Sequence, residues 1–169
     1  MQHVGGYRTM TASRIIVTSW LFAFLIGCGG GGGTPDVPEA QPAEETLSNI
    51  GDHTVHFSAQ STDQLPPDVA RAYNIVRSKN RAMLTVSVIH NELNTSVTAD
   101  VTVKTQNLTG QLKNVIMREI REPGETEAIY YVGETPVANH ETLIFDISVR
   151  PEGKTTSSVV RFKRQFYTD

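Results

Sequence analysis

The sequence has 169 residues, with 15 Lys and Arg against 18 Asp and Glu, so its formal net charge at pH 7 is −3. This balance, with only short basic clusters, disfavours nucleic acid as a partner, because a duplex-binding domain carries a concentrated basic face. The single cysteine leaves no second thiol for an internal disulfide or a cysteine-rich metal site.

Residues 1–27 have the order of parts of a bacterial signal peptide. Arg8 and Arg14 precede an uncharged apolar run over residues 15–26, and small Gly27 follows it. The run is shorter than the roughly 20 residues that a transmembrane helix requires. Translation from Met10 would keep the same signal, so the true start stays open.

Leu25, Ile26, Gly27 and Cys28 resemble a lipobox, in which the thiol receives a diacylglycerol and the leader is cleaved before the cysteine. An ordinary secretory leader with a chance cysteine is the alternative, and it would leave an unpaired thiol in an oxidising compartment. We therefore predict a lipoprotein held in the membrane through Cys28. Gly29, where aspartate would be an inner-membrane signal, favours the outer membrane by resemblance to the Gram-negative sorting rule.

Residues 28–47 are predicted to be the lipidated cysteine followed by a disordered tether. Five glycines come first, and prolines and acidic residues follow with almost nothing apolar. Such a chain of about 20 residues spans roughly 25 Å, which holds a domain clear of the lipid head groups.

Residues 48–169 read as one domain built of strands. Apolar and polar residues alternate with a period of two in most of the candidate segments, as in strands with one buried and one solvated face. Turn residues separate the segments at short intervals. The predicted strands lie near residues 52–59, 84–88, 97–104, 113–121, 128–133, 143–150 and 158–166.

The pattern predicts an all-β fold, a single immunoglobulin-like antiparallel β-sandwich of about seven strands. The prediction concerns architecture and not membership of the immunoglobulin family, because the sole tryptophan, Trp20, lies in the leader and not in the domain. A short helical insertion is expected after the first strand, with Pro67 at its first position and Asp68 in its first turn. On it, Val69, Ala72 and Tyr73 are expected to share one face.

The insertion and the residues after it resemble a family of small exported proteins from Gram-negative bacteria, known only as a domain of unknown function. The resemblance rests on residues 65–73 and 75–81, on 118–122 and 128–131, and on the ending at residues 166–169. It spans about residues 49–169. It implies an exported β domain but brings no established activity, cofactor or catalytic residue.

The candidate binding site is the basic segment after the insertion, Arg77, Ser78, Lys79, Asn80 and Arg81, with Tyr73 as a neighbouring aromatic contact. In a loop, its donors would converge on an anion, a carboxylate or an acidic patch of a partner. The alternative, which we favour, is that Arg77 and Arg81 form ion pairs with Asp68, Glu119 or Glu122 and join the insertion to the sheet.

Metal binding and catalysis find little support in the sequence. His53 and His56 are three apart in a predicted strand and so point to opposite faces, while His90 ends a strand and His140 lies in a turn. No metal-ligand spacing, nucleophile elbow or phosphate loop is present. We expect no cofactor, no metal and no enzymatic activity.

The sequence thus predicts a lipid-anchored outer-membrane protein that faces the periplasm. Its expected role is non-catalytic, either binding or envelope assembly, with an envelope protein or the cell wall as partner. An edge of the sandwich accepting a strand from that partner is one mechanism. The alternatives are a periplasmic carrier of a metal or small ligand and, third, an uncharacterised enzyme.

Overall fold

The computed structural model describes residues 45–124 and 127–169. The predicted signal peptide with Leu25, Ile26 and Gly27, the predicted lipidation site Cys28 and most of the tether lie outside these ranges, and their roles stay predictions. Within the described ranges, no helix has the length and apolar character needed to cross a membrane.

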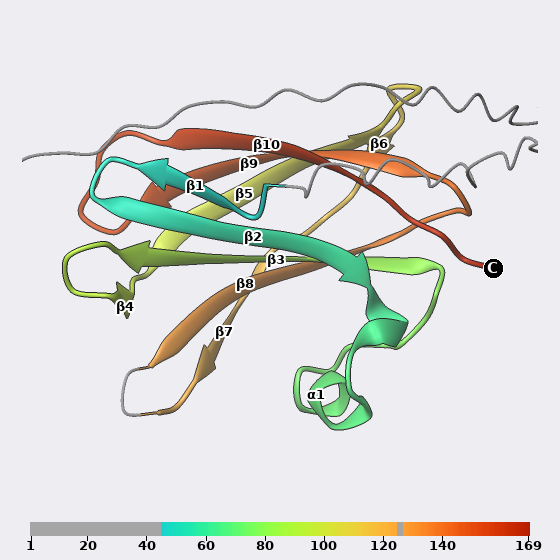
Figure 1. The fold of residues 1–169 in the computed structure, drawn as a ribbon, viewed down its shortest axis with the longest axis horizontal. Helices are drawn as coiled ribbons and strands as arrows, with labels where there is room; N and C mark the ends of the chain where they lie inside the picture. The colour runs from blue at the N-terminus through green and yellow to red at the C-terminus, as the bar shows by residue number, and fades with distance from the viewer. Residues whose placement is uncertain (1–44, 125–126) are drawn as a thin grey trace, which may run out of the picture. The chain divides into compact units, whose positions relative to one another are not determined.

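Two antiparallel sheets form a β-sandwich, which confirms the predicted fold class (Figure 1). Sheet A has the strand order β1-β2-β3-β8-β7, with β4 also paired to β3, and sheet B has the order β10-β9-β5-β6. The strands are β1 Leu47–Ile50, β2 His53–Ser61, β3 Arg81–His90, β4 Thr95–Ser96, β5 Ala99–Asn107, β6 Leu112–Lys113, β7 Arg118–Glu122, β8 Ala128–Pro136, β9 Thr142–Pro151 and β10 Ser158–Gln165.

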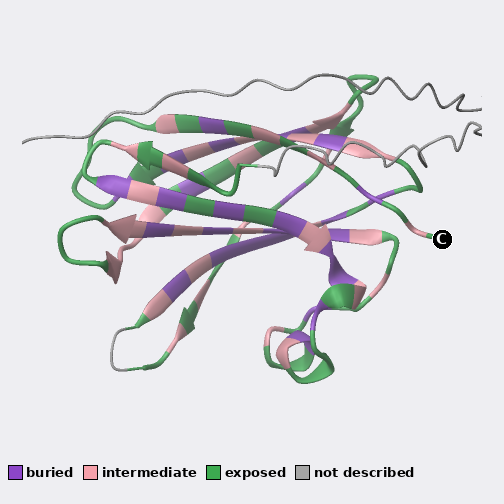
Figure 2. Ribbon diagram, viewed as in Figure 1, coloured by how far each residue is buried: buried purple, intermediate pink, exposed green. Residues whose placement is uncertain are grey.

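The core lies between the sheets and follows from the period-two alternation. Buried and less buried residues alternate along most strands, which gives the banding in Figure 2. Phe162 of β10 lies with its ring centroid 4.9 Å from that of Phe57 in sheet A and 4.9 Å from that of Phe145 in sheet B. These aromatic contacts join the two layers, and the burial of Phe57 and of Phe145 contributes about 1.5–3 kcal/mol each.

The predicted strand over residues 113–121 is wrong. β6 ends at Lys113 and pairs with β5 in sheet B, whereas β7 begins at Arg118 and pairs with β8 in sheet A. Residues 114–117 cross from one sheet to the other and pack on Gly133 of β8, where a Cβ atom would lie 2.6 Å from Val115 Cγ1. The β-branched residues of this run predicted a strand, but they gave no sign that the chain passes from sheet B to sheet A within it.

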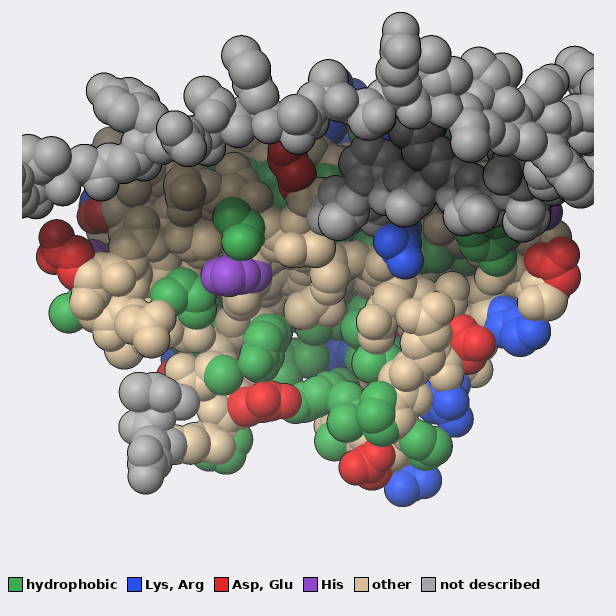
Figure 3. All heavy atoms as spheres, in the orientation of Figure 1, with side chains coloured by type: hydrophobic (Ala, Val, Ile, Leu, Met, Phe, Trp, Pro, Cys, Tyr) green, Lys and Arg blue, Asp and Glu red, His purple; other side chains and the backbone are tan. Residues whose placement is uncertain are grey.

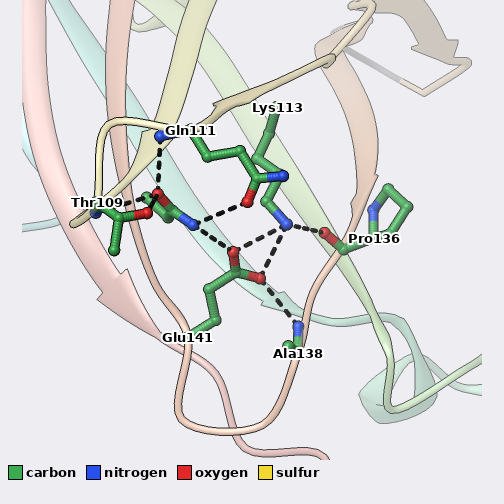
Figure 4. A network of polar contacts seen from close by, with 7 residues as sticks. Thr109, Gln111, Lys113, Pro136, Ala138 and Glu141 are labelled. Atoms are coloured by element: carbon green, nitrogen blue, oxygen red, sulfur yellow. Dashed lines mark hydrogen bonds and ion pairs between the residues drawn. The ribbon is translucent and has the colours of Figure 1, made fainter.

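A partly buried polar network ties the β5–β6 turn to the loop between β8 and β9 (Figure 4). Glu141 accepts hydrogen bonds from Asn107 Nδ2 at 3.0 Å and from the Ala138 N–H at 2.9 Å. Lys113 Nζ lies 2.8 Å from the same carboxylate. Burial alone would raise the pKa of Glu141, but the Lys113 ammonium and the other donors together hold this pKa below its usual value.

Candidate functional site

The predicted helical insertion is present, although short β1 precedes β2, so it follows the second strand and not the first. It consists of a 3₁₀ turn, Thr62–Gln64, and helix α1, Pro67–Ala72. Pro67 opens the helix, where its missing N–H removes no helical hydrogen bond. The helix ends because Asn74 has a φ of 53°, a left-handed conformation that a helix cannot continue through.

The insertion packs on the outer face of sheet A, away from the main core. It forms a second apolar cluster there, made of the buried residues Leu65, Ala70, Ile75, Met83 and Val132. The expected helix face was partly wrong, because Ala70 is buried in this cluster and Ala72 is exposed.

Two sets of hydrogen bonds hold the insertion in place. The buried hydroxyl of Thr62 lies 2.8 Å from the Val76 carbonyl and accepts a hydrogen bond from the Ser78 N–H at 2.9 Å. On the other side, Arg118 of β7 donates from Nη2 to the Tyr73 carbonyl at 2.7 Å. The insertion is therefore a fixed wall beside the sheet.

Between this wall and the sheet lies a groove of about 160 Å³, which we call the α1 groove. Figure 3 shows hydrophobic side chains gathered on this face between α1 and strands β7 and β8. The groove is lined by Leu65, Val69, Tyr73, Ile75, Met83, Thr85, Ile120, Glu122, Tyr130 and Val132. Its surface is almost wholly apolar, which is the character of a binding site for an apolar group.

Four of the lining residues carry a polar side-chain group: Tyr73, Tyr130 and Thr85 carry a hydroxyl, and Glu122 carries a carboxylate. Among the residues that the structure describes, none of them has a hydrogen-bond or ion-pair partner. Apolar walls with a few available polar groups are typical of a site that orients a ligand. Tyr73, a predicted binding residue, lies in this site.

The basic segment itself does not line the α1 groove. Its donors diverge into the fold: Arg77 donates from Nη2 to the Asp63 carbonyl at 2.6 Å, and Lys79 donates to the main-chain oxygen of Asp169 at 2.9 Å. The Ser78 side chain accepts from the Asn80 N–H at 3.1 Å. The segment therefore joins the insertion to β3 and to the C-terminal end of the chain.

The acidic partners expected for the two arginines were wrong. Arg81 lies 3.7 Å from Glu134 of the neighbouring strand β8, and Arg77 bonds to a backbone carbonyl. Asp68, Glu119 and Glu122 pair with neither arginine among the described contacts. The register of β3 on β8, which places Arg81 opposite Pro136, decides this choice, and it was not visible in the sequence.

Two of the histidines that were considered separately in the sequence lie side by side in the structure. His53 and His90 are directly paired across β2 and β3, with ring centroids 5.0 Å apart. His53 is buried and its Nδ1 lies 2.7 Å from Asp52 Oδ1, while His56 is exposed on the opposite face. Within the described ranges, no group of three His, Cys, Asp or Glu residues is placed to hold a metal ion.

This histidine pair lines an open cleft of about 570 Å³ that also includes residues of the β9–β10 turn. Its basic side chains already have acidic partners. Lys154 Nζ lies 2.7 Å from Asp52 Oδ2, and Arg121 lies 2.6 Å from Glu119. The cleft therefore offers fewer available charges than the α1 groove, and we take the groove as the candidate site.

Most of the groove was missed by reasoning from sequence. Ile120, Glu122 and Tyr130 lie on two strands that pair as Ile120 with Tyr130 and Glu122 with Ala128. They meet the insertion only because β8 pairs with β3. The available signal was apolar Ile120 and Tyr130 on the face opposite to the core residues Ile129 and Tyr131.

Comparisons with known proteins bear on this fold. None of the curated proteins compared with the chain matches it. A crystal structure of a DUF4426 family protein from Pseudomonas aeruginosa is similar, with 30% sequence identity and a TM-score of 0.64, over 75% of this chain and 96% of the Pseudomonas chain. The family model for DUF4426, a domain of unknown function, matches residues 47–169. The chain therefore belongs to the DUF4426 family.

Proposed function

We propose that this protein is an outer-membrane lipoprotein anchored through Cys28, and that its sandwich domain is a non-catalytic binding module in the periplasm. The lipobox resemblance and the glycine after Cys28 support the anchor and its membrane. The tether that the sequence predicts would let the domain reach a partner that lies away from the lipid surface.

The observation that carries the binding role is the α1 groove, an apolar hollow with four lining residues whose polar groups have no partner among the described residues. An apolar groove selects an apolar group of a protein over a glycan, so an envelope protein is the proposed partner. Burying one Leu-sized side chain there contributes about 1.5–3 kcal/mol. Stable binding therefore requires further contacts beside the groove.

Those further contacts are available at the adjacent edge of sheet A. β7 is the last strand of the sheet in the described structure and contributes Ile120 and Glu122 to the groove. An extended segment of the partner can add to such an edge through main-chain hydrogen bonds while a side chain enters the hollow. The α1 groove and the β7 edge would then bind the same segment of the partner.

The anchor is tested by mass spectrometry of native protein and by membrane fractionation. We expect an N-terminal acylated Cys28 in the outer-membrane fraction and release of a Cys28→Ala variant from that fraction. A bare thiol at Cys28 or an uncleaved leader in the native protein would contradict the anchor.

The groove is tested by crosslinking in living cells with the full-length protein. Ile120→Asp places a charge in the groove, and Val159→Asp places the same charge on an exposed position of β10. We expect the crosslinked envelope partner to be lost with Ile120→Asp and retained with Val159→Asp, provided both variants unfold at similar temperatures. Equal retention by the two folded variants would refute a binding role for the groove.

A further inference from the structure

We infer that the α1 groove recognises an extended segment with an apolar side chain and a basic side chain two positions away, laid along β7. The inference rests on the proposed function, because it names the chemistry of the partner at the same site. It follows from the geometry of β7 and from the charges around it.

The spacing of two comes from the strand. Ile120 and Glu122 both line the groove, because residues two apart in a strand lie on the same face. A strand added beside β7 has the same period, so two of its side chains separated by one residue would lie next to Ile120 and Glu122. The first would fill the apolar hollow and the second would face the carboxylate.

The charge comes from Glu122. The other charged residues of β7 are occupied within the fold: Arg118 bonds to the Tyr73 carbonyl, and Arg121 lies 2.6 Å from Glu119 and 2.7 Å from Glu127. Glu122 is half-buried and lines the hollow, and among the described residues it pairs with none. A Lys or Arg directly across the strand pair is the complement of this carboxylate.

The same arrangement disfavours other occupants. A wholly apolar chain would cover Glu122 and remove water from a charge without replacing it, which is unfavourable. An acidic segment would place like charges opposite each other. The charged side chains of β7 also discourage indiscriminate pairing at this edge, so only a segment with matching charges gains from it.

The test measures peptide binding by fluorescence anisotropy to the full-length lipoprotein in nanodiscs of zwitterionic lipid, with empty nanodiscs as the blank. Three labelled ten-residue peptides share Ser and Thr flanks and differ only at the centre: Leu-Thr-Lys, Leu-Thr-Glu and Gly-Thr-Lys. We expect Leu-Thr-Lys to bind at least fivefold more tightly than either of the others.

Two variants locate the preference. Glu122→Gln should reduce the preference for Leu-Thr-Lys over Leu-Thr-Glu to less than twofold, whereas Glu92→Gln, at an exposed turn position, should leave it unchanged. Equal binding of the two leucine peptides to the native protein, or a lysine preference that persists in Glu122→Gln, overturns the inference while the groove keeps its binding role. If neither leucine peptide binds more tightly than Gly-Thr-Lys, the proposed binding of apolar groups fails with it.

Discussion

Replacing Gly133 by alanine tests whether the crossing segment, residues 114–117, packs on β8 as closely as the structure shows. The added Cβ atom would lie 2.6 Å from Val115 Cγ1, 2.7 Å from Met117 Sδ and 3.2 Å from the Ile116 carbonyl oxygen. The flexible end of Met117 can move, but the β-branched side chain of Val115 has little rotamer freedom and the carbonyl belongs to the backbone.

Overpacking of this kind destabilises a core by about 1–3 kcal/mol, and the lower chain entropy of alanine in the unfolded state offsets about 0.5–1 kcal/mol. We therefore expect Gly133→Ala to lower the free energy of unfolding by about 1–2 kcal/mol. For a domain of this size, that corresponds to a melting temperature lower by about 4–8 °C. Thermal and urea unfolding followed by circular dichroism measure both quantities.

A double-mutant cycle identifies the cause. Val115→Ala removes the methyl group that clashes. Its cost in free energy of unfolding should therefore be about 1 kcal/mol smaller in the Gly133→Ala variant than in the native protein. Val160→Ala removes methyl groups from a buried valine of β10 that is not among the atoms close to Gly133, so its effect should be additive. Native stability in Gly133→Ala, or equal coupling for the two valines, would refute the close packing of the crossing segment.

Three further predictions concern the hydrogen bonds and charges that hold the fold. Thr62→Val should lower the free energy of unfolding by about 1–3 kcal/mol, because it leaves backbone groups of the segment after α1 without their partner, and the native value in urea unfolding would contradict this role. Lys113→Met should cost about 1.5–3 kcal/mol by leaving the Glu141 carboxylate without its cation, and Glu141→Gln should then cost less in that variant than alone; strict additivity would show that the two do not interact. The Lys154 ammonium lowers the pKa of Asp52 to about 2, so its carboxylate stabilises the folded state above the unfolded pKa of about 3.9, and this contribution is lost as the pH falls toward 2. Melting temperatures between pH 5 and 2 should fall less steeply for Asp52→Asn than for the native protein, and parallel curves would contradict the assignment.

The groove shows how far the sequence could lead to a site. Tyr73 was singled out beside the basic segment, and it does line the groove. Arg77 and Lys79 turned out to bond to the backbone at Asp63 and Asp169. Long basic side chains in a loop have many acceptors within reach, and which acceptor is near depends on how distant segments pack, which no local pattern records.

The alternation of apolar and polar residues by itself determined the all-β class, the positions of most strands and the side of each strand that is buried, because the period of a strand is set by its own backbone. Local sequence also determined the start of α1, since Pro67 fixes the backbone there. Only the tertiary structure decided which strands are neighbours, where the chain crosses between sheets at Val115, and that Ile120 and Glu122 lie beside Tyr73. These choices depend on contacts between residues far apart in the chain, whose energies arise only when the two sheets and the insertion are packed together.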